Sequence, residues 1–163
     1  MDRFTKGAKQ ALRYAHDEAM LFHHAHIGAE HLLLALIRDD DIAGKVLRER
    51  GASLDRARSA VALIIGHGEQ SEGAPKLTES VKKVIERAVD EARTLNHHHV
   101  GTEHLLLGLI VTRQGMAQAI LEELEIDRRI TAQLIFEKIG FEPLKQHAVM
   151  TNIMIRHKRE HDR

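Results

Sequence analysis

The chain lacks several features that would assign it to a common class of protein. It has no cysteine, which excludes disulfides, thiolate metal sites and cysteine nucleophiles. Its 24 basic residues balance 24 acidic ones, so no net charge attracts nucleic acid or an anionic membrane. No apolar run approaches the roughly 20 residues of a spanning helix, and Met1 leads into no secretory segment. We therefore expect a soluble, cytoplasmic protein.

Aromatic residues and prolines are also scarce. Aromatics make up 3% of the chain, and the two prolines, Pro75 and Pro143, lie outside the repeated segments described below. Apolar residues reach 43% and are mainly leucine, isoleucine, valine and alanine at helical spacing. This composition predicts an all-α fold.

One segment occurs twice. The stretch from His26 to Ile37 returns, with few changes, from His99 to Ile110. Residues 5–37 align without a gap on residues 78–110, and sixteen of the thirty-three positions are identical. This is an internal duplication, and each copy is expected to form one structural repeat.

Each repeat is predicted to contain four helices. Threonine caps and apolar periodicity start the first helix of each repeat, and a nearly wholly apolar second helix should form the centre of its core. One extra residue near Gly115 then shifts the alignment from an offset of 73 to 74. The predicted helices span about 5–24, 29–38, 42–50, 53–65, 78–95, 102–111, 116–124 and 127–139.

These patterns divide the chain into four parts. The first repeat covers residues 1–66 and the second covers 77–140. Between them, the glycine-rich segment 67–76 is predicted to be a flexible, exposed linker. The basic tail, 141–163, has little apolar periodicity and is expected to be loosely ordered.

The duplicated motif resembles a known family. Two tandem four-helix repeats, each with a Thr-capped first helix and a Gly-x-Glu-His-Leu-Leu-Leu-x-Leu-Ile second helix, are similar to the Clp N-terminal (Clp repeat) domain. The resemblance covers residues 4–140 and is closest to the N domain of ClpC-type AAA+ unfoldases. It implies an all-α domain with pseudo-two-fold symmetry, which does no chemistry but docks adaptors or marked substrates for a Clp protease. In the ClpC branch it further implies binding of phosphorylated arginine at two equivalent sites.

The resemblance also implies a set of ligand-binding residues. A phosphoguanidinium group needs a carboxylate to accept its N–H bonds, and hydroxyl, ammonium or helix-end amide groups to hold its phosphate. The first repeat departs from the family's pattern at one neighbouring position, where it has Ala29 and the second repeat has Thr102. The family's positions fall on Thr5, Lys9, Glu30, Thr78, Lys82 and Glu103.

The same residues also have structural interpretations. The two glutamates lie in the first turn of a helix, where a carboxylate interacts favourably with the helix dipole, and both threonines are helix caps. His31 and His104 are predicted to be packed, hydrogen-bonded structural residues. Histidine clusters at 23, 24 and 26 and at 97–99 allow a zinc hypothesis, but solvated polar turns are the favoured interpretation and no metal or cofactor is expected.

Two other functional classes compete with this one. A nucleic-acid or regulatory module would use the basic tail, but its small charge and lack of aromatic residues disfavour strong binding. An enzyme is disfavoured because no nucleophile with a positioned base is evident. No phosphate-binding loop is present either, so the chain is predicted to be a free-standing N domain. It is either a natural small paralogue or a cut from a larger protein, and the run from Met1 through a non-repeat tail favours the paralogue. Its expected partners are adaptor proteins, marked substrates or a Clp ATPase ring, with delivery and sequestration both open.

Overall fold

The computed structural model describes residues 3–69, 73–113 and 115–140. Within this part of the chain it contains eight helices and two strands of two residues each, so the all-α prediction is confirmed. Every predicted helix is present, with ends shifted by a few residues at most. The elements are α1 (Lys6–Leu21), β1 (His26–Ile27), α2 (Ala29–Arg38), α3 (Ile42–Glu49), α4 (Leu54–Ile64), β2 (Lys76–Leu77), α5 (Glu79–Thr94), α6 (Thr102–Thr112), α7 (Ala117–Glu123) and α8 (Arg128–Lys138).

The predicted caps start the first helix of each repeat. The Oγ1 atom of Thr5 accepts a hydrogen bond from the Ala8 backbone N–H at 3.1 Å. Thr78 accepts from the Val81 N–H at 3.2 Å in the same way. Each hydroxyl satisfies one of the free N–H groups of its helix and leaves its own proton available to another acceptor.

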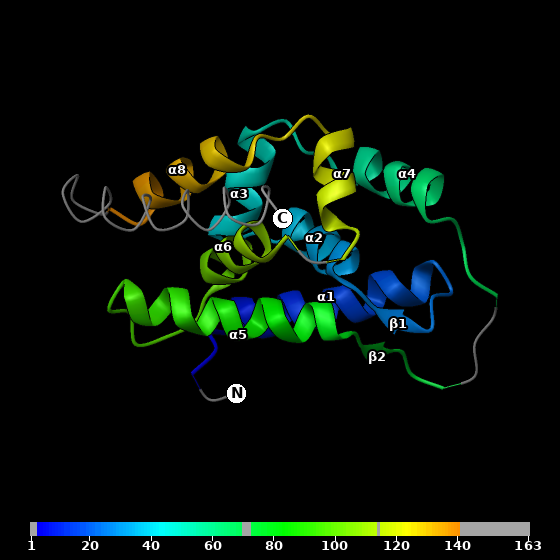
Figure 1. Cartoon of the computed structure of the whole chain (residues 1–163), viewed down its shortest axis with the longest axis horizontal. Helices are drawn as coiled ribbons and strands as arrows, with labels where there is room; N and C mark the ends of the chain where they lie inside the picture. Colours follow the sequence, from blue (N-terminus) through cyan, green and yellow to red (C-terminus); the bar gives the residue numbers. More distant parts are fainter. Residues whose placement is uncertain (1–2, 70–72, 114, 141–163) are drawn as a thin grey trace.

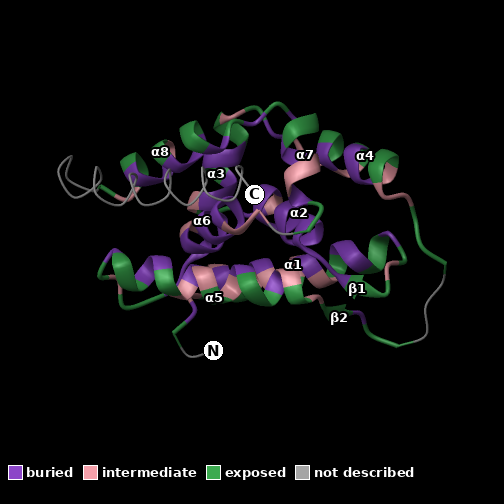
Figure 2. Cartoon of the chain, in the orientation of Figure 1, coloured by how far each residue is buried: buried purple, intermediate pink, exposed green. Residues whose placement is uncertain are grey.

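Helices α2 and α6 form the centre of the molecule. Figure 1 shows them between a lower layer of α1 and α5 and an upper layer of α3, α4, α7 and α8. They contact each other, and α1 packs on α2 as α5 packs on α6. In Figure 2 both are buried along most of their length, because nearly all their side chains are apolar.

The two repeats share one core. Buried side chains from both belong to a single apolar cluster, to which α2 contributes Leu33 and α6 contributes Leu106, both fully buried. The predicted division into two repeats, a linker and a tail stays a prediction. Part of the linker packs on the first repeat, since the Gly68 N–H donates to the Phe22 carbonyl at 2.8 Å. The tail lies outside the described residues.

Short extended segments connect the repeats in a crossed arrangement. β1 of the first repeat pairs in parallel with β2, which directly precedes α5 of the second. A matching parallel bridge joins Phe4, which precedes α1, to Val100, which precedes α6. The first helix of each repeat therefore begins beside the second helix of the other. Within the described residues, no helix is long and apolar enough to cross a membrane.

Candidate functional site

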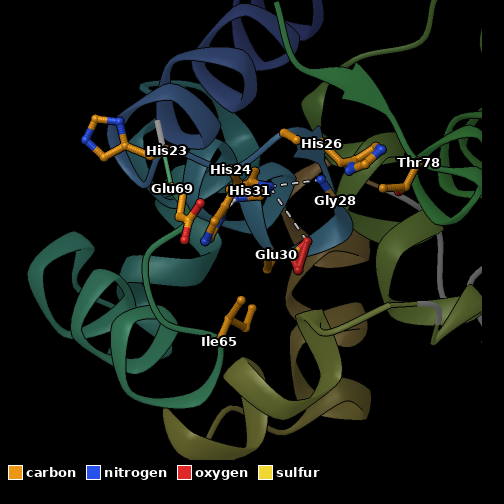
Figure 3. A pocket seen from close by; sticks show the side chains of 11 residues that line it. His23, His24, His26, Gly28, Glu30, His31, Ile65, Glu69 and Thr78 are labelled. Atoms are coloured by element: carbon orange, nitrogen blue, oxygen red, sulfur yellow. Dashed lines mark hydrogen bonds and ion pairs between the residues drawn. The ribbon is translucent and has the colours of Figure 1, made fainter. Parts of the chain in front are cut away.

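The pairing of β1 with β2 brings together two residues from different repeats that were predicted to bind a ligand, a glutamate and a threonine. Glu30, in the first turn of α2, and Thr78, the cap of α5, line one cavity of about 530 Å3 (Figure 3). The Thr78 N–H donates to the Ile27 carbonyl at 3.0 Å, which fixes the start of α5 beside the start of α2. The Thr5 N–H donates to the Val100 carbonyl, also at 3.0 Å, and so places Thr5 near the start of α6, where Glu103 lies.

Both glutamates are largely buried. Their side chains are 11% exposed at Glu30 and 16% exposed at Glu103. Burial raises the pKa of Glu30, against the opposing effects of its own backbone N–H and of His24. Burial also raises the pKa of Glu103, and the charges of Asp41 and Asp39 raise it further. Each carboxylate therefore pays a desolvation cost that a bound cation would relieve.

A histidine beside each glutamate is kept neutral by burial, and its hydrogen bonds fix its tautomer. The Gly28 N–H donates to Nδ1 of His31 at 2.9 Å, so the proton of His31 resides on Nε2. Nε2 lies 2.7 Å from Nδ1 of His24, whose Nε2 lies 2.8 Å from the Gly66 carbonyl. Burial first, and His24 second, lower the pKa of His31 to about 4. His31 is therefore no cationic partner for Glu30, although the two side chains approach within 3.7 Å.

The second repeat has the same arrangement. The Gly101 N–H donates to Nδ1 of His104 at 2.9 Å, and Nε2 of His104 lies 2.8 Å from Nδ1 of His97. Burial, followed by His97, lowers the pKa of His104 to about 4. The prediction that His31 and His104 are packed, hydrogen-bonded residues is confirmed.

The two glutamates thus lack a cationic partner in the part of the chain that is described. No lysine or arginine there forms an ion pair with Glu30 or Glu103. A buried carboxylate without a cation is costly, and such a group is a ready acceptor for a cationic donor from outside. The arrangement can therefore bind a guanidinium group without first breaking an internal salt bridge.

The two predicted lysines lie apart from this cavity. Lys82 donates to Glu79 on the surface of α5, with an Nζ to Oε1 distance of 3.3 Å. Lys9 is exposed on α1. Neither is among the residues that line the Glu30 cavity. Their part in ligand binding stays a prediction.

The difference between Ala29 and Thr102 lies beneath the sites. Thr102 is fully buried, and its Oγ1 accepts from the Ala43 N–H of the first repeat at 3.3 Å. Its hydroxyl also hydrogen-bonds the Asp39 side chain. Thr102 therefore joins the two repeats and is too deeply placed to contact a ligand, so the alanine at position 29 removes no exposed ligand-binding group.

Sequence reasoning missed several residues that line the cavity. His24 carried a signal, because His24 and His31 recur seven residues apart as His97 and His104. Glu69 carried none, since it follows the repeated segment and reaches the cavity through the fold of the chain. In the described segments, no three histidine or carboxylate side chains converge as ligands for a metal ion.

Comparison with known proteins identifies relatives over most of the chain. The sequence matches the Clp repeat (R) N-terminal domain family over residues 3–124 and 76–151. It is 38% identical over 151 residues to the negative regulator of genetic competence ClpC/MecB of Bacillus subtilis, covering 92% of this chain and 19% of that protein. It is 42% identical over 126 residues to the ATP-binding subunit ClpC of Staphylococcus aureus, covering 77% and 15%.

Solved structures agree with the sequence relatives. The N-terminal domain of the chaperone ClpD from Arabidopsis thaliana is 26% identical, with a TM-score of 0.73, over 86% of this chain and 96% of that one. The ClpV N-domain in its complex with a VipB peptide has the same fold, with a TM-score of 0.64 at 15% identity over 82% of this chain and 88% of that one. The chain spans about a fifth or less of the length of its ClpC relatives. It belongs to the Clp repeat N-terminal domain family.

Proposed function

We propose that this chain is a recognition module of a Clp protease system that binds proteins marked with phosphoarginine, and that it has no catalytic activity. The single observation that carries the proposal is a pair of largely buried glutamates, Glu30 and Glu103, that have no cationic partner among the described residues. Each lies beside the threonine-capped start of a helix from the other repeat. A guanidinium group supplies the N–H donors and charge that these carboxylates lack.

The second half of the ligand fits the capped helix ends. At the start of α5, the first-turn N–H groups of Glu79 and Ser80 precede the first intrahelical hydrogen bonds, and the Thr78 hydroxyl retains a proton to donate. A helix N-terminus of this kind favours an anion such as a phosphoryl group. Carboxylate and helix end therefore provide complementary contacts for the cationic and anionic parts of phosphoarginine.

The relatives support the broader assignment. ClpC proteins are ATP-binding subunits of Clp proteases by name, and the ClpV N-domain structure contains a VipB peptide. A shared N-terminal domain favours protein or peptide recognition in this chain as well. A Clp ATPase ring and adaptor proteins are its proposed partners, and the cytoplasm is its proposed location.

Calorimetric titration of phosphoarginine, followed by a phosphoarginine peptide, tests the proposal. Wild-type protein should bind, and the isosteric variant Glu30→Gln should bind at least tenfold more weakly at its site, because one charge-assisted hydrogen bond contributes about 1.5–3 kcal/mol. The double variant Glu30→Gln/Glu103→Gln should retain its helical circular dichroism and lose binding. Absence of binding to the wild type, or equal binding by the folded double variant, would refute the phosphoarginine assignment.

A further inference from the structure

The two proposed sites differ in one turn. In each repeat, the turn that follows the second helix lies against the start of the first helix. The turn after α2 contacts the start of α1, and a β-carbon on Gly7 would lie 2.7 Å from Oδ2 of Asp41. The turn after α6 contacts the start of α5 in the same way, and a β-carbon on Gly115 would lie 3.3 Å from Oγ of Ser80. The alignment offset of 74 pairs Asp41 with Gly115, although the Asp41 backbone is extended, with a φ of −96°, and the Gly115 backbone is left-handed, with a φ of +67°.

This one difference changes what the helix starts can accept. At α1, the Asp41 carboxylate already lies beside the first turn, where an incoming phosphoryl group would need the N–H groups of Lys6 and Gly7. At α5, the glycine brings no side chain, and the Ser80 hydroxyl adds a possible donor. At α1 the competing carboxylate, Asp41, lies beside the helix start itself, whereas the carboxylate that lines the Glu30 cavity, Glu69, is exposed to solvent.

The surroundings of the glutamates show the same asymmetry. Asp41 and Asp39 both act electrostatically on Glu103, whereas no neighbouring carboxylate is among the causes that shift the pKa of Glu30. Asp39, Asp40 and Asp41 together line a cavity of about 510 Å3 at the start of α1. Lys6 and Arg13 also line this cavity and offset part of that charge. Glu103 does not line this cavity, but Asp41 and Asp39 lie close enough to act on it, and their charges favour a bound cation and disfavour an added phosphate.

On this basis, and resting on the proposed function, we infer that the two sites select different forms of arginine. The Glu30 site binds phosphoarginine, and the Glu103 site binds the unmodified arginine side chain. A single chain would then bind one phosphoarginine and one unmodified arginine from the same segment of a substrate protein. The expected stoichiometry is one phosphoarginine per chain.

The test uses nuclear magnetic resonance on the full 15N-labelled chain, titrated separately with N-acetylarginine amide and its phosphorylated form. The Gly28 and Gly101 amides report on the two sites, since each donates to the histidine beside its glutamate. Phosphoarginine should shift Gly28 with at least tenfold higher affinity than Gly101, and arginine should show the opposite preference.

Two reciprocal variants exchange the charge difference between positions 41 and 115. Asp41→Asn removes the charge but keeps an oxygen to cap α3, and it should strengthen phosphoarginine binding at the Glu103 site about tenfold. Gly115→Asp should weaken phosphoarginine binding at the Glu30 site by a similar factor. Gly115→Asn is the matched control, because it places a side chain of similar size at the same left-handed φ of +67° while only aspartate adds charge.

The outcomes separate this inference from the proposed function. Equal phosphoarginine affinity at both sites, or no response to either charge exchange, would overturn the selectivity and leave phosphoarginine recognition intact. Absence of phosphoarginine binding at both sites would overturn the two proposals together.

Discussion

The two halves of the molecule agree in their cores and in the histidines beside the glutamates, and they differ in the turns that lie beside the proposed ligand sites. Leu33 and Leu106 occupy matching buried positions, whereas Asp41 of one turn corresponds to Gly115 of the other. Packing at the centre constrains both copies equally, because a change of one methylene is felt in a close-packed core. A turn residue at the surface is under no such constraint. The two copies have therefore kept the same scaffold, while the turns beside the proposed sites have diverged.

The largest effect is expected from substitutions in the core, and these variants also test whether the two repeats share a single core. Leu33→Ala and Leu106→Ala should each lower the free energy of unfolding by about 2–5 kcal/mol, since each removes a fully buried side chain. Urea denaturation followed by circular dichroism should show a single transition for both variants. Leu63→Ala, at a position 77% exposed, is the control and should have little effect. Two separate transitions would contradict a shared core.

A second difference between the repeats concerns buried ion pairs. Glu18, on α1, is 1% exposed and accepts two hydrogen bonds from Arg58, at 2.8 and 2.9 Å. Its counterpart Glu91 lies 3.9 Å from Arg87, in a looser contact. Arg58→Ala should cost about 3 kcal/mol because it leaves a buried carboxylate without its guanidinium, whereas Arg87→Ala should cost clearly less. Thermal unfolding of the two variants measures the difference, and equal losses would refute it.

The matched histidines predict an acid-sensitive fold. His31 and His104 have native pKa values of about 4, against about 6.5 in the unfolded chain, so the unfolded state binds more protons between these values. Stability should therefore fall as the pH is lowered from about 7.5 to 5, by roughly 2 kcal/mol per histidine. The raised pKa values of Glu30 and Glu103 act in the opposite direction at lower pH.

Asparagine variants identify the source of this pH dependence. Asparagine retains an acceptor for the Gly28 or Gly101 N–H but does not titrate. His31→Asn and His104→Asn should each remove about half of the loss in thermal stability between pH 7.5 and 5. An unchanged loss in the double variant would assign the effect to other groups.

The smallest effect concerns Thr102, one of the positions at which the second helices of the two repeats differ. Thr102→Ala makes the second repeat match Ala29 of the first and removes the hydrogen bond from the Ala43 N–H. It should cost about 1 kcal/mol of stability. Ligand affinity at Glu103 should stay unchanged, as measured by calorimetry, because Thr102 is fully buried. A marked loss of affinity would show that Thr102 contributes to ligand binding.

The fold was largely predictable from the sequence, and the site only in part. Threonine caps and the apolar α2 and α6 segments are local signals, so the eight helices followed from them. The pairing of Glu30 with Thr78 was not predictable, because two-residue strands such as β1 and β2 have no alternating pattern to reveal them. The role of Asp41 beside Gly7 depends equally on a contact between segments distant in the chain.

The crossed pairing of extended segments bears on how such a molecule arose. Because Glu30 and Thr78 come from different repeats, a protein with a single repeat would hold only half of each site and would need to dimerise to complete it. In a fused chain of two copies this assembly is intramolecular, with an effective concentration set by the connecting segment instead of by the protein concentration. A symmetric dimer must change both of its sites at once. A fused chain can change one site alone. The difference between Asp41 in the first repeat and Gly115 at the aligned position of the second is a divergence of this kind.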